Sequence, residues 1–166
     1  KSKHIGHVLV DERDASHIEK NINTKNLISK LGVRIGLENI TRLFPAKSNI
    51  PEKTYTILSA AWSEPAKDWP KPKSYRPVQL WVPEIIIAPD KPNPLSEFKW
   101  RGKIWHITES YGPERISPEW WLDEPKWRSG VRDYWFVQCD TGDRLWIYYA
   151  YGGLMSSGWF CQGKFA

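Results

Sequence analysis

Cysteine is scarce in this chain of 166 residues, which contains only Cys139 and Cys161. The two lie far apart in strand-like surroundings, so we expect buried free thiols, which suit a reducing compartment such as the cytoplasm. A zinc site would need more ligands at motif spacing, and the four histidines offer none with the cysteines. His4 and His7 could share an ion, but at an end of the chain that we expect to be frayed. We therefore expect no metal and no other cofactor.

Long apolar runs are also missing. None approaches the roughly 20 residues that a membrane-spanning helix requires, and no secretory signal opens the chain. These absences predict a cytoplasmic protein without a membrane partner. Methionine is nearly absent as well, since Met155 is the only one and the chain begins with Lys1. We therefore expect the chain to be a fragment of a longer protein whose remaining part lies upstream.

Catalytic motifs are missing too. The carboxylates are scattered, whereas metal-assisted phosphoryl transfer needs them clustered around Mg²⁺. There is no Gly-rich phosphate loop, no nucleophile elbow and no zinc-protease pair, and no spacing of Ser, His and Asp marks a triad. The sequence therefore favours a binding module without catalytic residues. A hydrolase of a novel type is an alternative that would need paired functional groups in a pocket.

Charge is modest and uneven. The net charge is +5 and the pI is near 9.2, which favours an acidic partner. No run of Lys and Arg marks a nucleic-acid-binding tail. Residues 1–50 carry nine Lys/Arg and five Asp/Glu, a balance of +4, whereas residues 51–97 balance at zero and residues 98–166 at +1. The basic excess therefore lies in the first third of the chain.

Residues 1–63 are expected to form a helix-containing segment that continues from the missing upstream region. Residues 7–10 could be a short strand or the tail of a preceding domain. Apolar residues then recur at helical spacing from Ile18 to Ile35, with Asp14 as the expected N-cap and Gly36 as a candidate residue just past the helix end. Residues 40–44 are expected to form a short strand.

Four basic residues lie on or beside the polar face of this predicted helix. Such a face is ordinarily just solvated, and the alternative is that it contacts nucleic-acid phosphates. The candidate nucleic-acid-binding residues are Lys20, Lys25, Lys30 and Arg34.

Residues 64–77 are rich in proline and lysine and form the expected domain boundary, a Pro-rich strap. Residues 78–166 are expected to form a β domain. Its first strand should be an edge strand in two parts, because Pro83 interrupts residues 78–88. Two hairpins and a last strand should follow, at residues 98–108, 131–150 and 158–165. The predicted fold class is α+β: a helical segment followed by a Trp-rich, mostly antiparallel β domain, as a small sheet or a partly open barrel.

Tryptophan is abundant, with eleven in the chain. Each ring can bury on the order of 150–250 Å², so a few can anchor a small core and any exposed ones would be binding platforms. Those expected in or beside strands, and therefore in the core or on a sheet face, are Trp100, Trp105, Trp135, Trp146 and Trp159.

Residues 111–121 place charged residues between aromatic ones. Gly112-Pro113 predicts a turn. One interpretation is a rigid corner in which Arg115 pairs with a carboxylate and stacks on Trp120 or Trp121. The alternative is an exposed aromatic and arginine hot spot for a protein or a nucleic acid strand.

Two further clusters lie in the predicted strands. In the first, Arg132 and Asp133 should point to opposite faces, so Arg132 is expected to reach Glu114 or Glu119 instead. The second cluster is the apolar end of the chain from Trp159, which could simply close a sheet. The candidate partner-binding residues are Arg115, Glu119, Trp120, Trp121, Arg132 and Trp159.

From about residue 27 to the end, the sequence resembles the C-terminal region of the ImuB family. Nine short motifs occur in the order seen in that family, including Gly-Pro-Glu-Arg-Ile and Pro-Glu-Trp-Trp. They are Leu31-Gly32 and residues 42–45, 48–52, 76–80, 98–102, 112–116, 118–121, 132–134 and 159–166. Gln162 departs from the histidine expected in many relatives, residues 149–157 diverge, and no sliding-clamp motif is found.

The resemblance implies a scaffold role. ImuB proteins are bacterial homologues of Y-family DNA polymerases, regarded as catalytically inactive, that serve in the SOS-induced mutasome. Their C-terminal region is thought to recruit a RecA-like accessory protein and an error-prone C-family polymerase for translesion synthesis on damaged DNA. A sliding clamp would bind through the missing upstream segment. By this resemblance the chain is a non-catalytic protein-interaction module, and a DNA-binding module is the alternative.

Overall fold

The computed structural model describes residues 12–71, 74–93, 95–121 and 124–166. The chain forms two compact units. The first, here called the helical unit, comprises residues 1–47 and 55–69, and the second, the sheet unit, comprises residues 48–54 and 70–166. The expected strand or tail at residues 7–10 lies outside the described residues.

The helical unit contains the predicted amphipathic helix and a pair of strands. Its elements are α1 (Glu12–Ile35), the short 3₁₀ turn η1 (Leu37–Asn39), β1 (Thr41–Pro45) and β2 (Tyr55–Ser59), with β1 and β2 antiparallel. The helix ends as predicted, because Gly36 has φ 87° and donates its N–H to the Gly32 carbonyl at 2.9 Å. The N-cap prediction is wrong, because the helix begins at Glu12 and Asp14 therefore lies within it.

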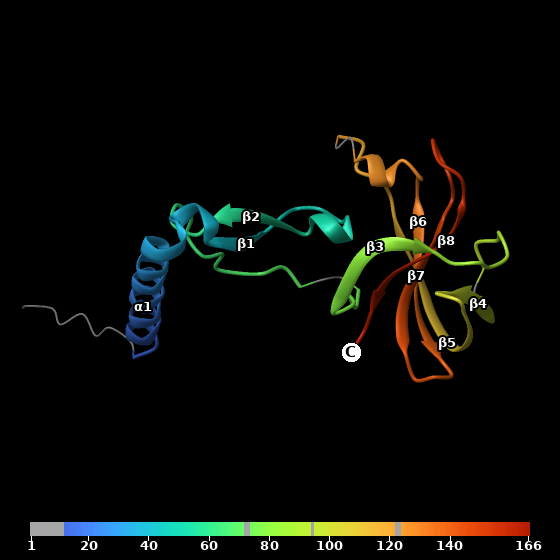
Figure 1. The fold of residues 1–166 in the computed structure, drawn as a ribbon, viewed down its shortest axis with the longest axis horizontal. Helices are drawn as coiled ribbons and strands as arrows, with labels where there is room; N and C mark the ends of the chain where they lie inside the picture. Colours follow the sequence, from blue (N-terminus) through green and yellow to red (C-terminus); the bar gives the residue numbers. More distant parts are fainter. Residues whose placement is uncertain (1–11, 72–73, 94, 122–123) are drawn as a thin grey trace, which may run out of the picture. The chain divides into compact units, whose positions relative to one another are not determined.

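The sheet unit is an antiparallel sheet of six strands (Figure 1). The strands lie in the order β3-β8-β7-β6-β5-β4. The two edges meet at one point, where Ile87 and Lys99 exchange two backbone hydrogen bonds of 2.9 Å each. The sheet therefore curls into a partly open barrel, and the α+β prediction is confirmed. The strands are β3 (Gln79–Ile85), β4 (Glu97–Trp100), β5 (Lys103–Ile116), β6 (Arg132–Cys139), β7 (Arg144–Ala150) and β8 (Gly158–Lys164).

Both faces of this sheet are buried in its central strands. The enclosed face carries alternate residues such as Trp135, Ile147 and Trp159. The outer face carries the residues in between, such as Tyr134 and Tyr148. Residues outside the sheet cover this outer face, including Ile50 from the 48–54 segment and Trp127 from η3 (Pro125–Trp127). Apolar residues therefore run almost continuously along these strands instead of alternating with polar ones.

Local details follow the sequence with one exception. Arg101 and Gly102 both have positive φ, 50° and 76°, as the tight turn of the first predicted hairpin requires. β3 is an edge strand with an irregular register between Leu80 and Glu84. Gly112-Pro113, however, does not end a strand. It lies within β5, where the register with β6 shifts, because β5 continues along β6 as far as Ile116.

Cys139 and Cys161 are buried free thiols, as expected. Burial raises the pKa of Cys139 to about 11 and that of Cys161 to about 12. Within the described residues, no helix has the length and apolar character that crossing a membrane requires.

Candidate functional site

Exposed apolar side chains form a band across the sheet unit. Three hollows define it. The first, of about 640 Å³, is lined by Ile87 and Ile104, and the second, of about 520 Å³, by Ile85, Ile87 and Met155. The third, of about 360 Å³, lies between Trp120 and Leu154. Ile87 belongs to the first two hollows, so these two adjoin, and Leu154 of the third hollow precedes Met155 of the second in the chain. The members of this apolar band are Ile85, Ile87, Ile104, Trp120, Leu154 and Met155, which are 56–89% exposed.

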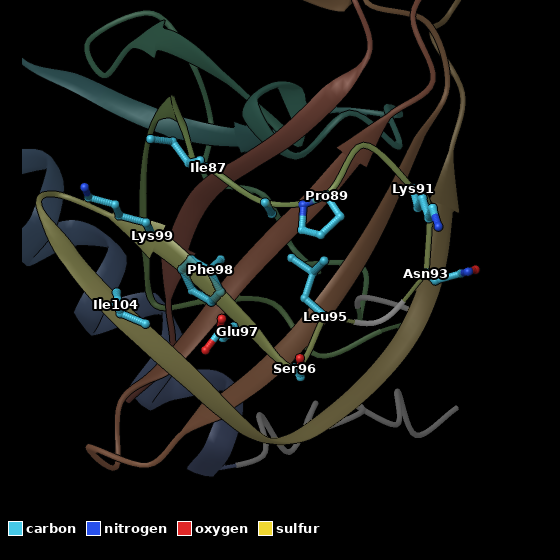
Figure 2. A pocket seen from close by; sticks show the side chains of 11 residues that line it. Ile87, Pro89, Lys91, Asn93, Leu95, Ser96, Glu97, Phe98, Lys99 and Ile104 are labelled. Atoms are coloured by element: carbon cyan, nitrogen blue, oxygen red, sulfur yellow. The ribbon is translucent and has the colours of Figure 1, made fainter.

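The first hollow lies where the two edges of the sheet meet (Figure 2). In register, Lys99 lies beside Ile87 on one side and beside Ile104 on the other, so the three side chains share one face. Figure 2 shows them grouped at one end of the hollow, with Pro89, Lys91 and Leu95 farther along it. The hollow therefore combines exposed isoleucines with two lysines.

Two packed loops hold the third hollow in shape. The Leu154 N–H donates to the Arg128 carbonyl at 3.0 Å, and the Tyr151 N–H donates to the Val131 carbonyl at 3.0 Å. Gly130 has φ 80°, and a Cβ there would lie 2.1 Å from the Gly152 carbonyl oxygen. Such close backbone contact leaves no room for a side chain. The exposed Leu154 is therefore presented on a firmly packed loop.

Trp120 and Trp121 are both exposed, and their rings meet edge to face with centroids 5.7 Å apart. The preceding residue, Glu119, is buried. One of its carboxylate oxygens accepts hydrogen bonds from the Ser48 hydroxyl at 3.0 Å and the Asn49 N–H at 2.9 Å. Glu119 therefore fixes the backbone directly before the two rings and is itself shielded from a partner.

Arg115 lies at the surface beside a buried carboxylate. It binds Asp133 through two hydrogen bonds of 2.7 Å, and its guanidinium lies 5.1 Å from the centre of the Tyr151 ring. The Tyr151 hydroxyl donates to the same carboxylate at 2.8 Å. The guanidinium of Arg115 lowers the pKa of Asp133. The expected carboxylate partner is present, but the aromatic partner is Tyr151 rather than Trp120 or Trp121.

Arg132 is buried and contacts neither Glu114 nor Glu119 in the described part of the chain. Its guanidinium lies between the rings of Trp127 and Tyr148, 3.9 and 4.6 Å from their centres. It donates to the Tyr134 hydroxyl at 3.3 Å. The prediction that it reaches Glu114 or Glu119 is wrong because other donors hold both carboxylates.

Those donors come from two other segments of the chain. Arg76 binds Glu114 through two hydrogen bonds of 2.5 and 2.6 Å, and Glu119 is held by Ser48 and Asn49. Arg132 instead belongs to a buried polar network beneath the 48–54 segment. In this network the Tyr134 hydroxyl donates to the side-chain amide oxygen of Gln162 at 2.8 Å, and the Gln162 amide nitrogen donates to the Glu52 carboxylate.

Trp159 lies inside the barrel, out of reach of a partner. Its ring N–H donates to the Lys91 carbonyl at 3.0 Å, and Asp90 accepts from the Tyr149 hydroxyl at 2.8 Å. These bonds hold the loop that lines the hollow in Figure 2. Of the six candidate partner-binding residues, three are exposed and three are buried. The exposed ones are Arg115, Trp120 and Trp121, and the buried ones are Glu119, Arg132 and Trp159.

The four candidate nucleic-acid-binding residues, all in α1, do not share one face. At about 100° per residue, Lys20, Lys30 and Arg34 fall within a sector of about 80°, whereas Lys25 lies about 140° from Lys20. Lys25 lines a hollow of the helical unit and pairs with Glu64 at 3.3 Å. A single phosphate-contacting face composed of all four is therefore excluded by the helix geometry.

The sequence alone did not indicate that most residues of the apolar band are exposed. Ile85 and Ile87 lie in and after an apolar strand and were expected to belong to a sheet, but nothing local distinguished an exposed isoleucine from a buried one. The one usable signal was Pro83, which marks an edge strand and thus a strand with fewer neighbours. Leu154 and Met155 lie in the Gly-rich stretch that diverges from the ImuB pattern.

Known proteins similar to this chain include Protein ImuB from two strains of Caulobacter vibrioides, NA1000 / CB15N and ATCC 19089 / CB 15. The chain is 37% identical to each over 151 residues. The match covers 84% of this chain and 32% of each relative, so the chain spans about a third of their length. No protein-family model and no solved structure matches the chain. The resemblance seen in the ordered motifs is thus confirmed, and over most of its length the chain is similar to ImuB.

Proposed function

We propose that the chain is a non-catalytic, cytoplasmic protein-interaction module of a Y-family polymerase-like protein that acts in DNA-damage-induced mutagenesis. The observation that carries the proposal is the apolar band. Monomeric proteins rarely leave large apolar side chains clustered on their surface, and such clusters commonly mark sites for another protein. Trp120 is the member best suited as an anchor, because exposed tryptophans are frequent among residues that dominate binding energy.

The partners proposed from the ImuB resemblance are a RecA-like accessory protein and an error-prone C-family polymerase. A sliding clamp would bind the segment upstream of this chain. In this proposal, Trp120 and Leu154 supply buried area on binding, while Arg115 and Lys99 lie at the polar margin. Glu119, Arg132 and Trp159 hold the loops that carry those residues.

Isothermal titration of the chain with each partner tests the proposal. Trp120→Ala should weaken binding by about 2 kcal/mol or more, roughly 30-fold in Kd, because the ring would lose its buried area in the complex. Its thermal stability should hardly change, because the ring is already exposed in the free protein. Trp62→Ala is the matched control, since Trp62 is an exposed tryptophan of the helical unit.

Two outcomes would contradict the proposal. One is that the folded chain binds neither partner. The other is that Trp120→Ala and Trp62→Ala weaken binding equally, which would move the docking surface away from the apolar band.

A further inference from the structure

The helical unit contains a further hollow with a different chemistry. Its volume is about 560 Å³, and it lies between α1, β1 and the turn after β2. α1 contributes Lys25 and Ser29, β1 contributes Arg42, and the turn contributes Trp62 and Ser63. The hollow therefore joins two cations, the carboxylate of Glu64, two hydroxyl groups and one large aromatic ring within a small space.

Arg42 is the central residue of this hollow. One of the two terminal nitrogens of its guanidinium has a hydrogen-bond partner among the described residues, and the other has none. One terminal nitrogen donates to the Ala60 carbonyl at 3.2 Å, which fixes the side chain against the turn. The other, Nη1, is buried and has no hydrogen-bond partner among the residues that the structure describes. Buried donors are nearly always satisfied, so this nitrogen leaves Arg42 with unused hydrogen-bonding capacity beside the hollow. A guanidinium matches the oxygens of a phosphate particularly well.

Of the other polar groups of the hollow, Lys25 is the one that suits an anion. Ser29 donates its hydroxyl hydrogen to the Lys25 carbonyl and Ser63 donates its own to the Ser59 carbonyl, so neither hydroxyl has a hydrogen left for an anion. Lys25 pairs with Glu64 at 3.3 Å, but both side chains are largely exposed, 66% and 78%. An exposed pair of this kind contributes little and is screened by salt. A phosphate can therefore replace Glu64 as the ion-pair partner of Lys25.

Trp62 adds a feature that a free anion would not need. Its side chain is 74% exposed at the rim of the same hollow, and its backbone N–H is held by the Ser59 carbonyl at 3.4 Å. An exposed ring beside phosphate-binding cations offers a face on which an unpaired base can stack. In a duplex the bases are already stacked on each other, so this arrangement favours a single strand.

We propose that this hollow binds single-stranded nucleic acid, with a backbone phosphate on Arg42 and Lys25 and the adjoining base on Trp62. The site lies within the helical unit and is independent of the protein-interaction function proposed for the sheet unit. Phosphate contact by Lys20, Lys30 and Arg34 is not part of it, because those side chains lie in a different sector of α1.

Fluorescence anisotropy with a labelled oligothymidine of about 15 nucleotides tests the site on the whole chain. Binding is expected at about 50 mM salt and should weaken steeply as salt rises. Trp62→Ala and Lys25→Ala should each weaken binding about five-fold or more, because they remove the stacking face and a phosphate contact. Arg42→Lys keeps the charge but loses the planar fork, so it should weaken binding without preventing folding.

Matched controls distinguish this site from general attraction to a basic helix or to any exposed ring. Lys30→Ala removes one positive charge from α1 outside the hollow, and Trp120→Ala removes an exposed ring from the sheet unit, so both should bind the oligonucleotide as the parent chain does. An abasic oligomer of the same length should bind about five-fold more weakly, because no base can stack. The proposal is overturned if no binding is seen at about 50 mM salt, or if the abasic oligomer or a duplex binds as well as oligothymidine. Equal losses from Lys30→Ala and Lys25→Ala would also overturn it.

Discussion

Glu119 and Trp120 are neighbours in the sequence and opposites in the structure. The Glu119 side chain is buried, 5% exposed, and accepts two hydrogen bonds from the 48–54 segment, whereas Trp120 is 89% exposed. The backbone between them thus passes from a fixed interior contact to the surface. The position of the exposed ring therefore depends on a carboxylate that no partner touches.

Replacing Glu119 should loosen this arrangement. Glu119→Ala removes the acceptor for Ser48 and Asn49 and should lower the free energy of unfolding by about 1–3 kcal/mol. Glu119→Gln keeps an acceptor oxygen in the same place and should cost less. Urea unfolding of the three proteins measures the difference, and equal losses from the two substitutions would show that the hydrogen bonds are not what stabilises this corner.

The 48–54 segment should contribute strongly to the stability of the sheet unit. Ile50 is 1% exposed and packs in the outer-face cluster, so Ile50→Ala should lower the free energy of unfolding by about 2–4 kcal/mol. Ile57→Ala is the matched control, because Ile57 is 63% exposed and its loss should cost about 0.5 kcal/mol or less. Near-ultraviolet circular dichroism during urea unfolding follows the buried tryptophans. A loss from Ile50→Ala no larger than the control's would place this segment outside the core.

Asp133 should make stability depend on pH. Its pKa is lowered in the folded protein, chiefly by hydrogen bonds from Arg115, with Tyr151 adding to the effect. The stabilisation is therefore present above the ordinary aspartate pKa of about 3.8 and is lost as the pH falls through the lower folded value. The wild type should exceed Asp133→Asn in free energy of unfolding most near pH 7, and the gap should narrow below about pH 4. A gap that stays constant between about pH 7 and about pH 3 would contradict the role of the ionised carboxylate.

Cys139 and Cys161 should resist thiol reagents in the folded protein. Both are buried, and their raised pKa values of about 11 and about 12 leave almost no thiolate at neutral pH. Labelling with a disulfide-exchange reagent at about pH 8 should therefore be slow in buffer and fast in concentrated urea. Rapid reaction of either thiol in buffer would mean that the barrel opens readily at β6 or β8.

The sequence by itself determined the local structure. The spacing of apolar residues predicted the helix and its end at Gly36, and two strand-like runs on either side of Arg101-Gly102 predicted the first hairpin, because these features depend on a few neighbouring residues. It also determined the relationship to ImuB, through motifs read in order. The strands were harder to predict from the sequence than the helix. The Tyr55–Ser59 strand was not predicted, because so short an apolar run shows no periodicity.

The tertiary structure alone decided which of these residues are available to a partner. Trp120 and Trp159 are the same residue type in two aromatic motifs, yet one lies at the surface and the other inside the barrel. Arg132 and Arg115 likewise differ, one between two buried rings and the other at the surface beside Asp133. The apolar band and the Arg42 hollow each join segments that are distant in sequence. Burial depends on those distant segments, such as 48–54 and the meeting of Ile87 with Lys99, and no local pattern encodes where they pack.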